Sequence, residues 1–139
     1  MDKALLDTDI FSEVLKGINV NVAAKATAYH AAFRRYTTSL ITLLEIVKGY
    51  HKVNREDRIQ QFLVLAPFVE WLTLDQNSAE TAGRILGDLE RTGQPIGRAD
   101  PMIAAIALRY DLILVTGNTT HYQRIQSLGY HLRLDNWKL

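Results

Sequence analysis

Four side chains with oxygen donors lie at positions of the 139-residue chain where they could share one reactive site. Asp7 and Asn118 each follow a short apolar run. Glu45 and Asp100 lie near the start of segments whose apolar residues recur at helical spacing. In an open parallel sheet, ligands bind at the carboxyl ends of the strands, and side chains just beyond those ends meet there. The sequence therefore predicts that these four residues gather in one pocket.

Three carboxylates in one pocket repel one another unless a cation or raised pKa values compensate. A divalent cation is the simplest compensation, and oxygen ligands in a chain without cysteine favour Mg²⁺ or Mn²⁺ over zinc. Such an ion lowers the pKa of a bound water and neutralises a leaving oxygen, which suits phosphodiester hydrolysis. We expect Asp7, Glu45 and Asp100 to hold the ion directly or through waters. Asn118 is expected to orient one of them, which makes all four residues candidates for catalysis.

Each of these residues also has a purely structural explanation. Asp7 could cap the helix that follows it, and Asp100 could cap the next helix before a proline. Thr42 and Glu45 have the spacing of a capping box, in which the glutamate only reaches back to the helix start. Asn118 after a glycine is an ordinary turn residue. The joint arrangement beside apolar segments favours the shared site.

The elements that must position these residues alternate between strand and helix patterns. Strands are predicted near 4–6, 36–39, 69–74, 112–115 and 130–134. Helices are predicted near 10–15, 22–34, 42–50, 56–66, 79–89, 100–109 and 122–128. Strands separated by helices imply right-handed crossovers, so the predicted fold class is a three-layer α/β/α sandwich with a mainly parallel central sheet, formed by one domain over 1–139.

The composition excludes several function classes. With 16 Lys and Arg against 15 Asp and Glu, the formal charge is only +1, so any nucleic-acid-binding face must concentrate its positive charge. The absence of cysteine excludes disulfides, zinc–thiolate sites and a thiol nucleophile. No basic leader precedes an apolar stretch, and no apolar run approaches the roughly 20 residues that cross a bilayer. A cytoplasmic location without membrane association is expected.

Residues beside the predicted site could contact a substrate phosphate. Lys48 lies one helical turn beyond Glu45, and Arg98 just precedes Asp100. Thr8 and Thr116 are assigned to substrate binding as well. Most other cations are expected to be solvated surface groups: Arg34, Arg35, Lys52, Arg55 and Arg58. A surface position is also favoured for His121 over proton transfer or RNA contact. Apolar residues that could line a dimer face are expected mainly in the core: Ile10, Phe11, Val14, Leu15, Ile46, Val47 and Tyr50.

At these residues the sequence resembles PIN-domain proteins, in particular the VapC branch of bacterial toxin–antitoxin systems. Segment 5–9 is similar to the family's "LLDTN", 39–49 to "S-x-I-T-x-x-E-x-x-x-G", 96–105 to "I-G-x-x-D-x-x-I-A-A", 115–122 to "T-x-N-x-x-H-F", and 136–137 to "NW". The resemblance spans almost the whole chain and keeps the segments in order.

This resemblance implies a metal-dependent endoribonuclease, usually a homodimer, whose groove is occupied by the C-terminal segment of a VapB-like antitoxin. Structured RNA such as a tRNA is the implied substrate, with single-stranded loops as the expected target. Two positions depart from the family: Asn118 stands where many relatives have Asp, and Asp9 where many have Asn. The alternatives are a catalytically inactive RNA- or protein-binding module and a DNA-directed metal nuclease of the same fold.

Overall fold

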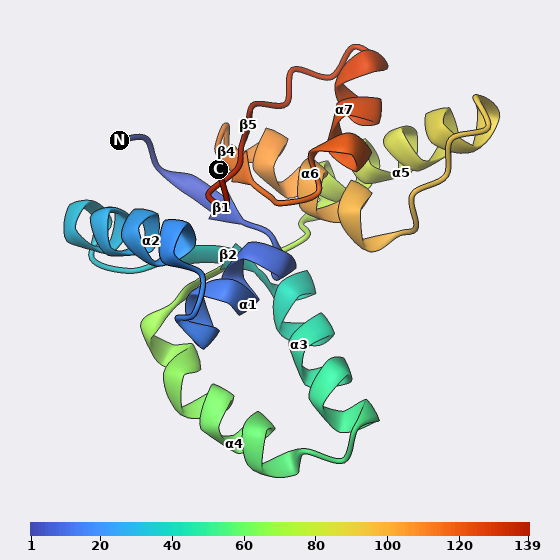
Figure 1. Ribbon diagram of the computed structural model, residues 1–139. Coiled ribbons are helices and arrows are strands. Elements are labelled where there is room, and N and C mark those ends of the chain that lie inside the picture. The colour runs from blue at the N-terminus through green and yellow to red at the C-terminus, as the bar shows by residue number, and fades with distance from the viewer.

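Short parallel strands lie at the centre of the computed structural model, which describes residues 1–139 (Figure 1). The strands are β1 (Ala4–Leu6), β2 (Thr37–Ser39), β3 (Glu70–Leu72), β4 (Ile113–Val115) and β5 (Leu134–Asp135). β4 pairs with both β1 and β5, and β2 pairs with β3, each pair being parallel. β1 and β2 lie side by side. There the Thr38 hydroxyl donates to the Leu6 carbonyl at 2.8 Å, so a side chain links the two sheets.

Helices cover both faces of these strands. They are α1 (Thr8–Lys16), α2 (Val20–Phe33), α3 (Leu40–Lys52), α4 (Glu56–Leu65), α5 (Gln76–Arg91), α6 (Ala99–Arg109) and α7 (Thr119–Ser127), with a 3₁₀ turn at η1 (Ala66–Phe68). Figure 1 shows α1 to α4 on one side and α5 to α7 on the other. The alternation of strand residues matches this arrangement: Leu5 and Leu114 belong to the core beside α5–α7, and Leu6 and Val115 to the core beside α1–α4. The predicted three-layer α/β/α class is confirmed.

Side-chain caps determine where several helices begin. Asp7, Asn19 and Asp75 each accept a hydrogen bond from the backbone N–H three residues further on. Ser39 does the same for α3, which therefore begins at Leu40 and not near residue 42 as predicted.

The last strand also differs from its prediction. We expected it over 130–134, but β5 covers only Leu134–Asp135. The Leu132 N–H is used within the local turn, where it donates to the Tyr130 carbonyl at 2.9 Å. Pairing with β4 starts at the Arg133 carbonyl, which accepts from the Leu114 N–H at 2.8 Å. The apolar pattern of this segment reflects packing of the buried Leu132 in the core and not strand pairing.

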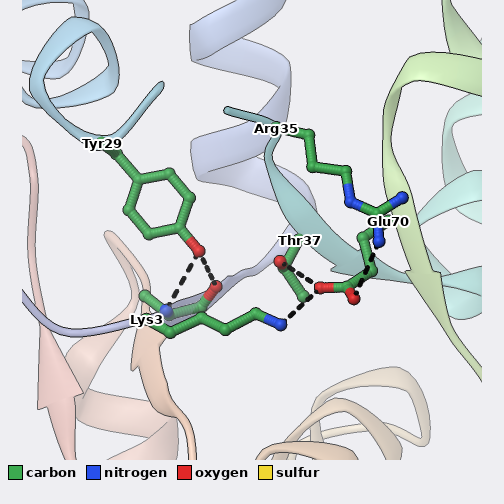
Figure 2. Close-up of polar contacts among 6 residues, drawn as sticks. Lys3, Tyr29, Arg35, Thr37 and Glu70 are labelled. Carbon is green, nitrogen blue, oxygen red and sulfur yellow. Dashed lines mark hydrogen bonds and ion pairs between the residues drawn. The ribbon is translucent and has the colours of Figure 1, made fainter. Parts of the chain in front are cut away.

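Polar contacts join β1 to the second sheet at the amino ends of the strands (Figure 2). Glu70 at the start of β3 accepts from Lys3 at 2.8 Å, from the Thr37 hydroxyl at 2.7 Å and from Arg35 at 3.3 Å. We call these four residues the Glu70 clamp. Burial raises the pKa of Glu70, but the hydrogen bonds from Lys3 and Thr37 and the nearby positive charges outweigh it, so the pKa lies below its ordinary 4.5. The ionised carboxylate therefore holds three segments together.

Tyr29 of α2 holds the start of β1 from the other side (Figure 2). Its buried hydroxyl donates to the Ala4 carbonyl at 3.1 Å and accepts from the Ala4 N–H at 3.2 Å. Both backbone groups of this strand residue are thereby satisfied by one side chain.

No helix in the structure is both long and apolar enough to cross a membrane.

Candidate active site

Asp7 lies at the carboxyl end of β1 and is 4% exposed. Its Oδ1 accepts from the Ile10 N–H at 2.9 Å, so the predicted capping role is confirmed, and its own N–H donates to the Val115 carbonyl at 3.0 Å. Burial raises the pKa of this carboxyl to about 6, and hydrogen bonds from Ile10 and Thr116 oppose the rise. The negative charges of Asp9 and Asp100 raise it further. Asp7 is thus both the cap of α1 and a carboxylate that experiences the negative charge of other acids.

Asp100 lies in the first turn of α6, where the helix dipole favours a negative charge. The alternative in which it serves as the N-cap is wrong, because Arg98 occupies that position without a side-chain cap. Both carboxylate oxygens of Asp100 instead contact α7. Oδ1 accepts from the Tyr122 hydroxyl at 3.2 Å, and Oδ2 lies 3.0 Å from Nδ1 of His121.

Glu45 projects from the second turn of α3. Its Oε1 accepts from the Thr8 hydroxyl at 2.5 Å, and that hydroxyl lies 3.0 Å from the hydroxyl of Thr42. The capping-box alternative for Glu45 is wrong because Ser39 caps this helix and accepts from the Thr42 N–H at 3.3 Å. Glu45 is therefore held toward α1 and not toward the start of its own helix.

Tyr122, which donates to Asp100, is a residue that we did not predict for the site. Its side chain is fully buried, and its pKa is raised well above 10, first by burial and then by the charges of Asp100, Asp7 and Glu45. One phenol thus lies within the electrostatic reach of carboxylates from three distant segments. The sequence offered only a weak signal, because the apolar spacing of α7 explains a buried tyrosine without a site.

Asn118 and His121 extend this cluster. The Asn118 side-chain nitrogen lies 2.8 Å from His121 Nδ1, the same atom that contacts Asp100. One ring nitrogen either donates to Asp100 or accepts from the amide of Asn118, so the tautomer decides which contact is made. His121 lies at the surface with 36% of its side chain exposed, but it also lies within hydrogen-bond distance of two site residues, which we did not predict.

The four candidate substrate-binding residues fall into two groups. Lys48 and Arg98 are exposed and have no carboxylate within ion-pair distance. Thr8 is partly buried and donates to Glu45. Thr116 is fully buried, and its hydroxyl accepts from the Asn118 N–H at 2.9 Å. Lys48 and Arg98 thus face solvent, whereas Thr8 hydrogen-bonds to Glu45 and Thr116 to Asp7.

No group of three or more His, Asp and Glu side chains is arranged to hold a metal ion by itself. The donor set nevertheless suits a hard cation, because Mg²⁺ keeps several waters and usually takes only one or two carboxylates from a protein. Asp7 and Asp100 fit that requirement, since the charge of one carboxylate acts on the other. Their repulsion would be relieved by a divalent ion with waters completing its coordination.

A groove of about 360 Å³ begins at Glu45 and continues between α1 and α3. Its lining includes Thr8 and Glu45 at one end and Leu15, Tyr50 and Val53 further along. An adjoining cavity of about 540 Å³ shares Lys16 and part of the apolar wall with this groove and adds the basic residues Arg55 and Arg58. Glu45 is thus reached along a channel with an apolar wall and a basic far end.

Comparison with known proteins agrees with this geometry. Residues 4–126 match the PIN domain. The chain is 31% identical to a Shigella flexneri protein named tRNA(fMet)-specific endonuclease VapC, with 99% of each chain covered. It is 30% identical to ribonuclease VapC1 of Haemophilus influenzae strain R2866, covering 91% of this chain and 94% of that one. The crystal structure of DNA-bound VapBC from Salmonella typhimurium contains a chain that matches with a TM-score of 0.80 and 28% identity, covering 99% of both chains. This chain therefore belongs to the PIN-domain family, beside the VapC proteins.

Proposed function

We propose that this protein is a metal-dependent endoribonuclease and the toxin of a toxin–antitoxin system, which cuts structured RNA such as a tRNA and thereby inhibits translation. The observations that support the proposal are the position of Asp7 at the carboxyl end of β1, the contact of Glu45 with Thr8, and the contacts of Asp100 with Tyr122 and His121. The ribonuclease names of its relatives support the same activity.

The chain's own residues divide the work in this proposal. Asp7 and Asp100 hold Mg²⁺ or Mn²⁺ with the help of waters, and Glu45 contributes directly or through a water. When bound, the ion would lower the pKa of a water and neutralise charge on the leaving oxygen. The Tyr122 hydroxyl fixes the orientation of the Asp100 carboxylate, and His121 does so in the tautomer that carries a proton on Nδ1. In the other tautomer, Asn118 takes part as a neutral group that donates to His121.

Substrate contact is assigned to the exposed cations beside the site. Lys48 and Arg98 flank Glu45 and Asp100 in the sequence, so each can reach a phosphate next to the cut. Thr8 and Thr116 position site residues, because the Thr8 hydroxyl donates to Glu45 and the Thr116 hydroxyl accepts from the Asn118 N–H. Single-stranded RNA fits such an edge best, because its backbone and bases can enter a narrow groove.

A VapB-like antitoxin is the proposed protein partner. The related Salmonella protein was solved as a VapBC complex. In this chain the groove between α1 and α3 leads from the apolar Leu15 and Tyr50 to Glu45. An antitoxin segment with apolar side chains could lie along that wall and block access to the carboxylates.

A homodimer is also proposed, but through residues other than those considered from the sequence. Ile10, Phe11 and Ile46 are buried in the core beside α1–α4, and the other candidates pack against it. Exposed apolar side chains that remain for a dimer include Leu40 and Leu44 on α3. Sedimentation of the purified protein will measure its oligomeric state.

Cleavage assays test the proposed activity. Single-stranded RNA and DNA of the same sequence are incubated with the protein and Mg²⁺, Mn²⁺ or EDTA. We expect RNA cleavage with either ion, none with EDTA, and a loss of at least about 100-fold in Asp7→Asn and Asp100→Asn. Asp2→Asn, an exposed acid, is the matched control. Cleavage of DNA alone would indicate a DNA nuclease, and RNA binding without cleavage would indicate a binding module. Full activity of Asp7→Asn would refute the assigned site.

A further inference from the structure

Asp9 and Lys138 form an ion pair at the edge of the candidate site. The Lys138 Nζ donates to Asp9 Oδ2 at 2.9 Å, although the two residues are 129 positions apart. The pair lies directly on Gly117, which precedes Asn118. A Cβ atom at Gly117 would be 2.6 Å from Asp9 Oδ2 and 3.0 Å from Lys138 Nζ, so a larger residue there would displace the ion pair.

The backbone of Lys138 is fixed by contacts of its own. The preceding Trp137 is 2% exposed and packs in the core. The Lys138 N–H donates to Asn136 Oδ1 at 2.9 Å, and its carbonyl accepts from the Asn21 side chain of α2 at 2.9 Å. These anchors direct the lysine side chain over Gly117 toward α1.

The ammonium group of Lys138 lies among negative charges. Its hydrogen bond with Asp9 raises its pKa most, and the charges of Asp9, Glu13 and Asp7 raise it further. Asp9 in turn is one of the two carboxylates whose charge raises the pKa of Asp7. The pair thus places a fixed positive charge within reach of the buried carboxylate of the site.

We propose that Lys138 is a built-in counter-ion that withholds Asp9 from divalent cations, so that Asp7, Glu45 and Asp100 take one ion and not two. The inference rests on the proposed metal-dependent function. Three ionised carboxylates outweigh the charge of one divalent ion, so the site with one ion keeps a net negative charge. With two such ions the site would have a net positive charge. Asn118 is neutral, so Asp9 is the carboxylate that could supply the missing charge, and Lys138 neutralises it.

Titration with Mn²⁺ alone, without RNA, tests this proposal. Free Mn²⁺ is followed by electron paramagnetic resonance at low ionic strength. The wild-type protein is expected to bind one ion. Lys138→Met is expected to bind a second ion, because the site gains one net negative charge. Lys138→Arg keeps the charge and is expected to behave as wild type. Lys25→Met removes the same charge from an exposed position of α2 and is the matched control.

The cycle with Asp9 separates charge release from the other effects of losing the lysine. Asp9→Asn leaves an unbalanced ammonium group and should weaken Mn²⁺ binding. The double variant Asp9→Asn with Lys138→Met restores neutrality and should bind one ion as wild type does. An equal gain from Lys138→Met with and without Asp9 would overturn the proposal.

Other outcomes distinguish this proposal from the proposed function. If Lys138→Met binds Mn²⁺ as wild type does and Asp7→Asn loses binding, the counter-ion role is overturned. The proposed metal-dependent function is then still supported. Absence of Mn²⁺ binding in both the wild type and Lys138→Met overturns both.

Discussion

Asp7 combines two requirements that conflict. It caps α1 and is almost fully buried, yet the proposed reaction needs its ionised form beside other carboxylates. Burial raises its pKa from 3.8 to about 6, which means that folding disfavours the charged form. The protein therefore carries an electrostatic cost at its candidate site that a bound cation would relieve.

Asp7→Asn should make the protein inactive but more stable. Since the pKa of Asp7 is raised in the folded state, its contribution to stability is greatest below pH 4 and is lost as the pH rises toward 6. Asparagine keeps the cap without the charge. In EDTA at pH 7 we expect the free energy of unfolding to rise by up to about 3 kcal/mol. Thermal denaturation measures the change.

The pH dependence provides the control for this substitution. At pH 3.5 the carboxyl of Asp7 is protonated in the folded state and mostly protonated in the unfolded state, so most of the gain in stability should disappear. Asp2→Asn, at an exposed position, should show no such pattern. An Asp7→Asn protein that melts at the wild-type temperature at pH 7 would contradict the interpretation that burial makes this carboxylate costly.

At the scale of elements, the Glu70 clamp joins two sheets that share no strand pairing. β1 and β2 are linked by the Thr38 hydroxyl, and the clamp adds Lys3 and Glu70 at the amino ends. Because the pKa of Glu70 is lowered in the folded state, its contribution to stability is present above pH 4.5 and is lost as the pH falls through its folded-state pKa.

Glu70→Gln should lower the free energy of unfolding by about 1 kcal/mol at pH 7, because the partners are partly exposed and the ion pairs are screened. Urea denaturation at pH 7 and at pH 3 measures this difference. The difference from wild type should be smaller at pH 3 than at pH 7, because the wild-type carboxyl takes up a proton as the pH falls. Glu80→Gln, at an exposed position of α5 without an ion pair, is the control. A difference that stays the same at both pH values would show that charge is not its cause.

Element boundaries could be predicted where one local residue determines them. Gly17 ends α1 with a positive φ of 68°, and Asp75 caps α5. The start of α3 was misplaced because Ser39 and Thr42 are both capable caps, and only the tertiary structure selects the serine. The last strand was misplaced because Leu132 is apolar for packing and not for pairing.

In the candidate site, too, the residues could be predicted from local motifs, but their contacts with distant parts of the chain could not. Motif positions predicted Asp7, Glu45 and Asp100 together, but not the contacts that hold them. Thr8 meets Glu45 across 37 positions, and Tyr122 meets Asp100 across 22. A single sequence carries no periodic signal for such pairs, because each depends on how helices on different parts of the sheet are placed.

On the scale of the whole molecule, a net charge of +1 provides little general attraction for RNA. Affinity for RNA must come from a few cationic side chains at defined positions. The salt dependence of Kd reports how many of them contact phosphates. In the Asp7→Asn background, which does not cut, Lys48→Gln and Arg98→Gln should each reduce the slope of log Kd against log salt by about 0.7 to 1. Fluorescence anisotropy with single-stranded RNA measures the slope.

Arg133→Gln is the control for this measurement. Arg133 is exposed and already paired with Asp111 at 3.1 Å, away from the carboxylates, so its removal should leave the slope unchanged. Equal effects of all three substitutions would indicate diffuse binding over the surface and not a defined path for the RNA.

The pairing of β1 with β4, and of β4 with β5, has a consequence during synthesis on the ribosome. Asp7 is synthesised well before Val115 and Thr116, the residues that hydrogen-bond to it. A fragment released before β4 is made therefore lacks the strand that pairs with β1 beside Asp7. Such a fragment is expected to lack the nuclease activity proposed for the folded chain.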